Sequence, residues 1–460
     1  MFLGSVDQTI VAAALPVIAH SFGGLALATW VVTGYLLAAT VAAPIYGRLG
    51  DAFGRKRMLL WSLGLFLAGS SVCAIAPSLA ILVVGRCLQG FGGGGLMTLS
   101  QALIGEVVSP KERGRFQGWF GAVFALASTI GPAAGGVMTQ YIGWRSIFWI
   151  NLPLCVLAGL TASRLKAAEG TGKYRTDISG ILLFTAGTVA LLLGLSFGGH
   201  ELSWKSAELV ALFVLAALCS GLFCRFEHRS PDPLLAPRLV EKPIVWRSAL
   251  VVLLFAAVLF GLIVQLPLFL QVEFGISTTI SGLLLIPLTI AQVIVSTATG
   301  LRISATGKPR NSMLFGLAGV SVLLFALVPL LHHGPVLVAV LTLFIGAGLG
   351  STMPAAQTMV QWAAGDGDLG AATAMLSFAR SVGGVLGTAI SSAVLLATQS
   401  SMHNALPSPR SNGFGWMFLT LGALSFIAAL TTASSPPLQQ LHCRTSTSQA
   451  SRTSGIYRRR

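Results

Sequence analysis

Two charged side chains interrupt apolar stretches of this sequence, where a charge is costly. Asp7 lies in the apolar segment 1–19, and Arg86 stands between Leu82 and Leu88 in another. A carboxyl group in a low-dielectric medium can bind and release a proton near neutral pH, because burial disfavours its charged form. An Arg inside a membrane is also costly, so its presence favours a functional use. The alternatives are an Asp that only bonds a neighbouring helix and an Arg whose side chain reaches an interface.

A glycine-rich charged segment follows the second apolar stretch. It reads GRLGDAFGRKR and contains Gly47, Asp51, Gly54 and Arg55. The glycines allow a tight turn and the close approach of helices, and Asp51 beside Arg55 can form a charge pair that locks and unlocks. The segment therefore predicts a gate at one mouth of the protein. An ordinary solvated basic loop is the alternative.

Small residues mark two of the apolar stretches. Gly131-Pro132 and Gly135-Gly136 predict a bend and a close helix contact, because proline removes a backbone donor and glycine lets a neighbour approach; a plain packing kink is the alternative. The run from Gly90 matches a dinucleotide-binding pattern, but it follows no strand and lies in apolar sequence. We therefore expect a packed or cavity-lining backbone there, with the following candidates for a central cavity: Gln89, Gly90 and Arg380.

The elements that must position these residues are membrane-spanning helices. The chain has 460 residues, of which 54% are hydrophobic and 9% charged, whereas a soluble domain has about 25% charged residues. A soluble globular protein is excluded. Spans of roughly 20 apolar residues predict an all-α polytopic membrane protein with about fourteen helices, over 1–19, 27–47, 58–77, 79–104, 116–138, 145–163, 179–199, 207–224, 248–271, 277–301, 312–331, 335–360, 370–396 and 414–434. The first span is expected to be unusually short or cut at its start.

The basic residues are sorted to one side of these spans. The chain carries 29 Lys and Arg against 14 Asp and Glu. All but five of the Lys and Arg residues lie in the loops after even-numbered spans or in the tail. The exceptions are Arg86, Arg145, Lys205, Arg380 and Arg410. By the positive-inside rule both termini face the cytoplasm, as in a multi-pass protein of the inner or plasma membrane. Nucleic acid is not an expected partner, because the charge is scattered over short loops without an aromatic-rich basic module.

An internal repeat divides the chain. One constant spacing aligns Gly90, Gln101, Gly114 and Gly131 with Gly346, Gln357, Gly370 and Gly387, and a slightly different one places Ser304 on Asp51. Transporters are often built from such duplicated halves, with the substrate path between them near midplane. We therefore predict a six-helix bundle (1–164), a two-helix insertion with its flanking loops (165–247), a second six-helix bundle (248–434) and a disordered basic cytoplasmic tail (435–460). Because Ser304 replaces the acid, the two gates should not be equally strong.

Together these motifs resemble the fourteen-helix drug:proton antiporters of the major facilitator superfamily, the EmrB/QacA type. The resemblance rests on the segment Asp7 to Pro16, the loop Gly47 to Arg57, Arg86 with Gln89-Gly90, and the glycine-proline motif of the fifth span. It implies the major facilitator fold and an antiporter rather than a symporter.

The resemblance also implies roles for single residues. Asp7 would take part in proton coupling and Arg86 would aid proton transfer. Asp51 and Arg55 would form the cytoplasmic gate, and Gly131-Pro132 would control helix bending and leak.

The resulting hypothesis is a carrier that exports lipophilic neutral or monocationic compounds in exchange for protons, with the proton gradient in place of a cofactor. No acid lies in the middle of a span in the C-terminal half, which disfavours dicationic substrates. A periplasmic adaptor protein is a compatible partner. The alternatives are a dedicated metabolite exporter with the same skeleton, a non-transporting membrane sensor, and a polytopic enzyme. No zinc-protease motif, P-loop or metal site is found to support an enzyme.

Overall fold

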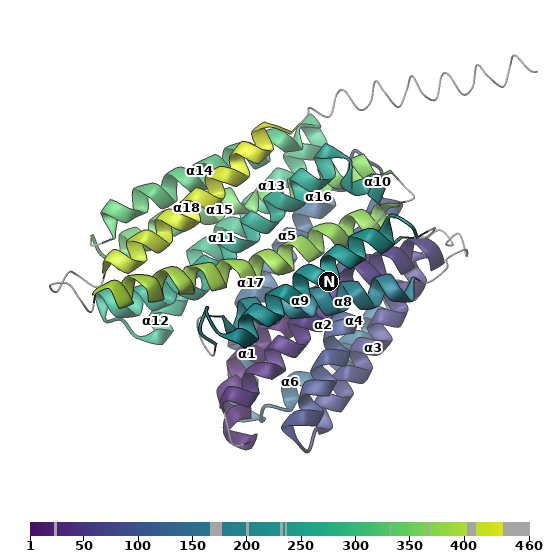
Figure 1. Cartoon of the computed structure of the whole chain (residues 1–460), viewed down its shortest axis with the longest axis horizontal. Helices are drawn as coiled ribbons and strands as arrows, with labels where there is room; N and C mark the ends of the chain where they lie inside the picture. The colour runs from purple at the N-terminus through teal and green to yellow at the C-terminus, as the bar shows by residue number, and fades with distance from the viewer. Residues whose placement is uncertain are drawn as a thin grey trace, which may run out of the picture.

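The computed structural model of the chain is built from α-helices (Figure 1). It describes residues 1–22, 25–165, 177–198, 202–230, 233–234, 237–331, 333–365, 368–402 and 411–435. The N-terminal helices are α1 (Phe2–Phe22), α2 (Leu25–Phe53), α3 (Arg55–Ile75), α4 (Leu79–Val107), α5 (Arg113–Tyr141), α6 (Ser146–Trp149) and α7 (Asn151–Ser163).

Two long helices and a short one follow in the middle of the chain: α8 (Ile178–Phe197), α9 (Ala207–Glu227) and α10 (Pro237–Val240). The C-terminal helices are α11 (Pro243–Phe274), α12 (Thr278–Leu283), α13 (Ile286–Thr306), α14 (Pro309–Leu330), α15 (Pro335–Gly350), α16 (Thr352–Ala364), α17 (Leu369–Met402) and α18 (Ser411–Ala433).

Helix ends follow from residue types that the sequence makes visible. The hydroxyl of Ser78 accepts a hydrogen bond from the Ile81 amide and caps α4. Gly54, between α2 and α3, has φ 93°, and Gly307, which ends α13, has φ 66°. Both values are in the region that favours glycine. The two glycines occupy matching places in the internal repeat, so the same turn chemistry recurs in both halves.

The described residues contain twelve helices long and apolar enough to cross a membrane. A thirteenth is formed if the two bent parts of α1 are taken as one span. The 29-residue helix α5 is not among these candidates. The prediction of an all-α multi-pass protein is confirmed, whereas the count of fourteen spans exceeds the twelve or thirteen found. The difference lies in α1 and α5, the helices that carry the bend and the glycine-proline motif.

Glycines related by the internal repeat contact corresponding helices. A methyl group on Gly90 would lie 2.3 Å from the α2 backbone, and one on Gly346 would lie 2.1 Å from the α13 backbone. A methyl group on Gly131 would lie 2.0 Å from a side chain of α1, and one on Gly387 would lie 2.1 Å from the α11 backbone. Only glycine permits such approach. Thus α4 packs on α2 as α15 packs on α13, and α5 packs on α1 as α17 packs on α11.

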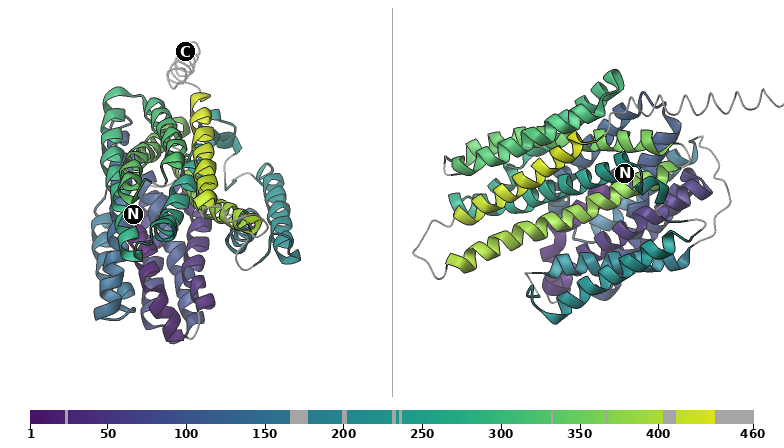
Figure 2. Two further views of the ribbon diagram at one scale, coloured as in Figure 1. Left: turned by 90° about the vertical axis from the view of Figure 1, so that its left-hand side faces the viewer. Right: turned by 45° about the horizontal axis from the view of Figure 1, so that its top comes forward.

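The helices α8 and α9 pack on each other and lie at the side of the bundle (Figure 2, left). Of the two, α8 also packs against α2 and α17, which come from opposite halves of the sequence. The predicted division into six, two and six helices stays a prediction. The predicted tail 435–460 lies outside the described residues apart from Ser435.

Helices of the two halves meet at one end of the molecule, which we call the basic end because it carries Arg55, Lys111 and Lys242. There the Trp362 indole donates a hydrogen bond to the Pro110 carbonyl (3.1 Å). Slightly deeper, the side chain of Gln361 in α16 donates to the carbonyl of Gln101 in α4. The basic end lies near α10 in Figure 1, and away from it the α1–α7 bundle and the α11–α18 bundle point in different directions.

Candidate functional site

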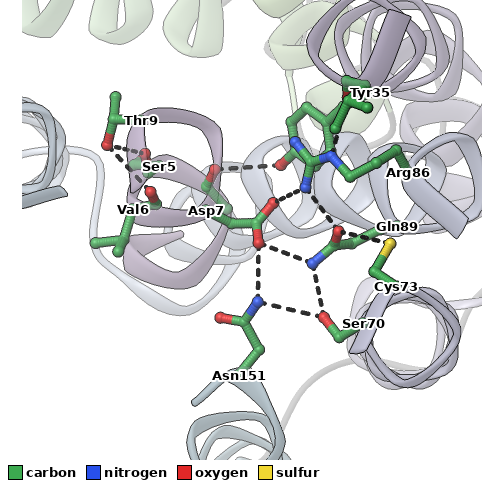
Figure 3. A network of polar contacts seen from close by, with 12 residues as sticks. Ser5, Val6, Asp7, Thr9, Tyr35, Ser70, Cys73, Arg86, Gln89 and Asn151 are labelled. Carbon is green, nitrogen blue, oxygen red and sulfur yellow. Dashed lines mark hydrogen bonds and ion pairs between the residues drawn. The ribbon is translucent and has the colours of Figure 1, made fainter. Parts of the chain in front are cut away.

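Asp7 and Arg86 form a buried ion pair (Figure 3). Asp7 Oδ2 on α1 lies 2.6 Å from Arg86 Nη1 on α4, and the two residues are 0% and 1% exposed. Asp7 is therefore paired with a charge from another helix. The sequence singled out both residues but did not show that α1 and α4 bring them together. Each charge neutralises the other, which lowers the high cost of burying either alone.

Three polar side chains complete the surroundings of this pair (Figure 3). Gln89 Nε2 and Asn151 Nδ2 each donate to Asp7 Oδ1 at 2.8 Å. Ser70 Oγ accepts from both amides, at 2.6 Å and 3.3 Å. Gln89 Oε1 accepts from Arg86 Nη1 at 2.6 Å. Side chains from α4 and α7 therefore bond the carboxylate directly, through bonds whose strength depends on its charge, and Ser70 on α3 bonds the two amides behind it.

Tyr35 on α2 lies on the other side of Arg86. The guanidinium carbon is 4.2 Å from the centre of the Tyr35 ring, and Arg86 Nε donates to the Val31 carbonyl at 3.1 Å. The Tyr35 hydroxyl donates to the Gly4 carbonyl at 3.2 Å. Tyr35 also lines the central cavity described next. Its ring thus stands between the ion pair and the space where a substrate could bind.

No strong signal in the sequence marks Ser70, Asn151 or Tyr35. Asn151 lies in an apolar segment without any recognised motif, and Ser and Tyr are common in apolar helices. A polar amide at the start of the sixth apolar stretch was the available clue, but its partner depends on which helices pack together.

A cavity of about 170 Å³ lies between the halves of the chain. Its lining comes from α1, α2, α4, α5, α8, α11 and α17, and includes Gln8, Tyr35, Met97, Thr98, Phe124, Phe260, Ser377 and Arg380. A smaller cavity of about 30 Å³ shares Phe124, Phe260 and Arg380 with it. Residues from both halves therefore line the cavity. This is what alternating access requires, because the cavity opens to one side of the membrane and then to the other as the halves rock against each other.

The candidates for a central cavity are placed differently from one another. Arg380 lies in the wall of both cavities. Gln89 belongs to the Asp7 network and Gly90 is packed against the α2 backbone, and neither is among the residues that line these cavities. The glycines that do line the larger one are Gly93 and Gly94, one turn further along α4.

At the basic end, Asp51 links α2 to the first turn of α17. Its carboxylate accepts hydrogen bonds from the backbone amides of Gly370 and Ala371, both at 2.9 Å, and from Arg55 Nη2 at 2.6 Å. Arg55 Nη1 in turn lies 2.6 Å from Glu106 Oε2. A carboxylate at a helix N-terminus satisfies amides that lack intrahelical partners and interacts favourably with the helix dipole. Asp51 therefore fastens the two halves together.

Gly47 makes this contact possible. A methyl group there would lie 2.7 Å from the Gly370 carbonyl oxygen. On the symmetry-related side, Ser304 Oγ accepts a hydrogen bond from the Arg115 amide at 2.9 Å, in the first turn of α5. One neutral acceptor thus stands where the other side has a carboxylate with two backbone bonds, as expected from the loss of the acid.

The glycines of α5 pack against the segment of α1 that carries Asp7. A methyl group on Gly135 would lie 2.3 Å from the Ile10 carbonyl oxygen, whereas nothing lies within 4 Å of the corresponding point on Gly136. The side chain of Pro132 lies outside the described residues.

These two adjacent glycines give a matched pair of variants. Gly135→Ala should destabilise the protein by about 1–3 kcal/mol, because the methyl group forces α1 and α5 apart. Gly136→Ala should be neutral or slightly stabilising, because Ala favours helix by up to about 1 kcal/mol. Thermal unfolding of both purified variants checks this. Equal stability of the two would contradict the packing described here.

Among the residues described, no three His, Cys, Asp or Glu side chains are grouped as metal ligands. The arrangement instead consists of a polytopic helical bundle with a cavity between its halves and a buried ion pair beside that cavity. At the basic end the halves are joined by the bonds from Asp51 to the first turn of α17, which we call the latch. These are the features of a membrane transporter. The sequence profile of the Major Facilitator Superfamily matches residues 1–388, and the chain belongs to that family. It is a transporter rather than an enzyme.

Relatives of the chain include transporters with named roles. The multidrug transporter protein MdtP of Bacillus subtilis is 35% identical over 406 residues, which are 87% of this chain and 74% of that protein. Multidrug resistance protein 3 of the same organism is 31% identical over 405 residues, covering 85% and 76%. An uncharacterized MFS-type transporter of Mycobacterium tuberculosis is 35% identical over 394 residues; the match covers 85% of this chain but only 57% of that longer protein.

Solved structures support the fold. The human organic anion transporter MFSD10 superposes with a TM-score of 0.67 at 16% identity, covering 94% of this chain and 97% of that one. The proton:xylose symporter XylE superposes with a TM-score of 0.68 at 14% identity, covering 95% and 94%. At such identities the likeness concerns the fold alone.

Proposed function

We propose that the protein exports lipophilic small molecules across the membrane in exchange for protons, with Asp7 as the proton-binding group. The observation that supports this most is the Asp7–Arg86 pair, which is buried beside the central cavity and separated from it by Tyr35. Relatives named multidrug transporters favour drug-like substrates. In this proposal the chain has fourteen spans arranged as six, two and six helices, and the basic end faces the cytoplasm.

Coupling would act through the charge of Asp7. When the carboxylate gains a proton, its attraction to Arg86 is lost, and the guanidinium remains as an uncompensated buried charge. The contact between α1 and α4 then becomes unfavourable, and a movement of α1 relative to α4 relieves it. Because α1 also carries Gln8, which lines the cavity, the same movement alters the substrate site.

The latch at Asp51 would set the direction of opening. With Asp51 bound to the first turn of α17, the halves are joined at the basic end, and substrate enters or leaves at the other end. Release of Asp51 lets the halves rock apart at the basic end, as alternating access requires.

The test is transport in everted membrane vesicles with a panel of lipophilic fluorescent compounds of positive, zero and negative charge. An inward-acidic gradient should drive uptake of at least one compound. An ionophore that collapses the gradient should abolish that uptake. Uptake that continues unchanged after collapse would exclude proton coupling, and absence of any gradient-driven uptake across the panel would count against export of such compounds.

A further inference from the structure

The central cavity carries charge of one sign. Among the residues that the structure describes, no Asp or Glu side chain lines either part of the cavity, whereas Arg380 lines both. Arg380 is the twelfth residue of α17, about 17 Å along the helix from Leu369 at 1.5 Å per residue. That distance is about half the thickness of the hydrocarbon core. The charge is therefore placed near the middle of the membrane.

Arg380 has neighbours that do not neutralise it. Its Nη2 lies 3.2 Å from the sulfur of Met97, and its guanidinium carbon lies 4.7 Å from the centre of the Phe124 ring. In the described ranges no ion pair includes Arg380. A guanidinium has five N–H donors, and a thioether is a weak acceptor. Most of the hydrogen-bonding capacity of Arg380 is therefore left for something inside the cavity.

The partners of Arg380 differ from those of Arg86, another arginine inside a spanning helix. Both arginines lie well inside spanning helices, but Arg86 has Asp7 at 2.6 Å and further acceptors in Gln89 and Val31. An intramembrane charge normally pairs with a partner or faces a functional cavity. Arg86 follows the first pattern and Arg380 the second.

Two further polar side chains belong to residues that line the same cavities as Arg380. Thr98 is among the residues that line the larger cavity, and Gln357 is among those that line the smaller one. These residues are 0% and 2% exposed, and neither of these polar groups has a hydrogen-bond partner. Buried polar groups are rarely left unpaired, so each one points to an absent partner. Aromatic rings of Phe124 and Phe260 adjoin the same space and suit an apolar body.

We propose that this cavity binds a lipophilic organic anion, an aromatic or aliphatic body with one carboxylate or sulfonate group held by Arg380. The oxygens of the acid group accept from the guanidinium, and Thr98 or Gln357 supplies a further donor. This inference rests on the proposed export function and defines its substrate class. It replaces the monocationic compounds expected from the sequence, because a cation would meet the uncompensated charge of Arg380 in a low dielectric.

An anionic substrate has an energetic consequence. Export of one monoanion in exchange for one proton moves two positive charges inward, whereas export of a monocation for one proton moves none. The membrane potential therefore drives export of an anion even without a pH difference.

The test uses three naphthalene probes whose charge does not change near neutral pH: the anion 2-naphthalenesulfonate, the neutral 2-naphthalenesulfonamide, and a quaternary naphthylmethyl-trimethylammonium cation. Equilibrium binding is measured on the full-length protein in nanodiscs of zwitterionic lipid. The sulfonate should bind at least about tenfold more tightly than the ammonium. Arg380→Gln should weaken sulfonate binding about ten- to a hundredfold and leave the sulfonamide little changed, while Arg380→Lys should retain part of the affinity. Arg302→Gln, at an exposed arginine of α13, is the matched control.

Several outcomes would overturn the proposal. Equal or tighter binding of the ammonium by the wild-type protein would do so even if the Arg380 variants did not fold. Unchanged sulfonate affinity in Arg380→Gln would leave Arg380 with a packing role. An acidic lipid headgroup offers the same chemistry, so loss of sulfonate binding in nanodiscs with phosphatidylglycerol would assign the site to lipid. Gradient-driven uptake of the ammonium alone in vesicles would retain the export function and reject the anion.

Discussion

The double variant Asp7→Asn with Arg86→Gln is expected to lose gradient-driven transport while remaining folded. Removing both charges leaves amide groups that can keep most hydrogen bonds to Gln89 and Asn151, whose own bonds to Ser70 involve neither charge. Replacing a whole buried ion pair by neutral groups is often close to neutral for stability. The proton-binding group is nevertheless gone, so the pH difference can no longer drive substrate movement.

Each single variant should behave differently. Asp7→Asn leaves Arg86 charged and unpaired, and Arg86→Gln leaves the Asp7 carboxylate unpaired. Breaking one side of a buried pair costs about 3–5 kcal/mol. Both singles should therefore unfold at clearly lower temperature than either the wild type or the double variant. Thermal unfolding in detergent and substrate uptake in vesicles are measured for the wild type, both single variants and the double variant, which together form a double-mutant cycle.

A control separates loss of coupling from loss of binding. The double variant should still exchange labelled for unlabelled substrate across the membrane without a gradient, because the cavity wall is unchanged. If the two single losses of stability simply add in the double variant, the pair is not an energetic unit. If the double variant accumulates substrate under a pH gradient as the wild type does, Asp7 is not the coupling group.

Asp51→Asn is expected to shift the conformational equilibrium toward opening at the basic end. The substitution removes the charge that holds Arg55 and places an amide donor against one of the backbone N–H groups of Gly370 and Ala371. Loss of a charge-assisted hydrogen bond costs about 2–3 kcal/mol, which changes the equilibrium by roughly thirtyfold or more. Spin-label distances between positions 57 and 302, exposed at the basic end of opposite halves, measure this shift.

Ser304→Ala is the matched variant on the symmetry-related side. It removes one neutral hydrogen bond to the Arg115 amide, worth about 1 kcal/mol. Its effect on the spin-label distances should therefore be clearly smaller than that of Asp51→Asn. An equal or larger effect would show that the two latches do not differ as the acid and the hydroxyl imply.

Composition and local pattern were enough to predict the membrane-spanning helices, because apolar length and turn residues are properties of short segments. They also singled out Asp7, Arg86, Asp51 and Arg380, since a charge in apolar sequence is visible without a fold. The repeat anticipated that Ser304 would take the place of Asp51. These features depend on the chain order alone.

The partners of these charges could not be predicted in the same way. The sequence showed Asp7 and Arg86 only as charges in two different apolar segments, but α1 lies against α4 and α7, which brings Arg86 and Asn151 to the carboxylate. Likewise Gln89 looked like a cavity residue, yet the rotation of α4 turns it into the Asp7 network and turns Thr98 toward the cavity. Such contacts depend on how the helices pack against each other, and this packing cannot be predicted from the types of single residues.

The most direct test of the account is the direction and origin of proton movement during transport. In proteoliposomes with an internal pH indicator, an imposed gradient of a transported substrate should drive protons in the opposite direction through the wild-type protein. The double variant at Asp7 and Arg86 should exchange substrate without any such pH change. Proton movement in the same direction as the substrate, or equal proton movement by the double variant, would contradict antiport through Asp7.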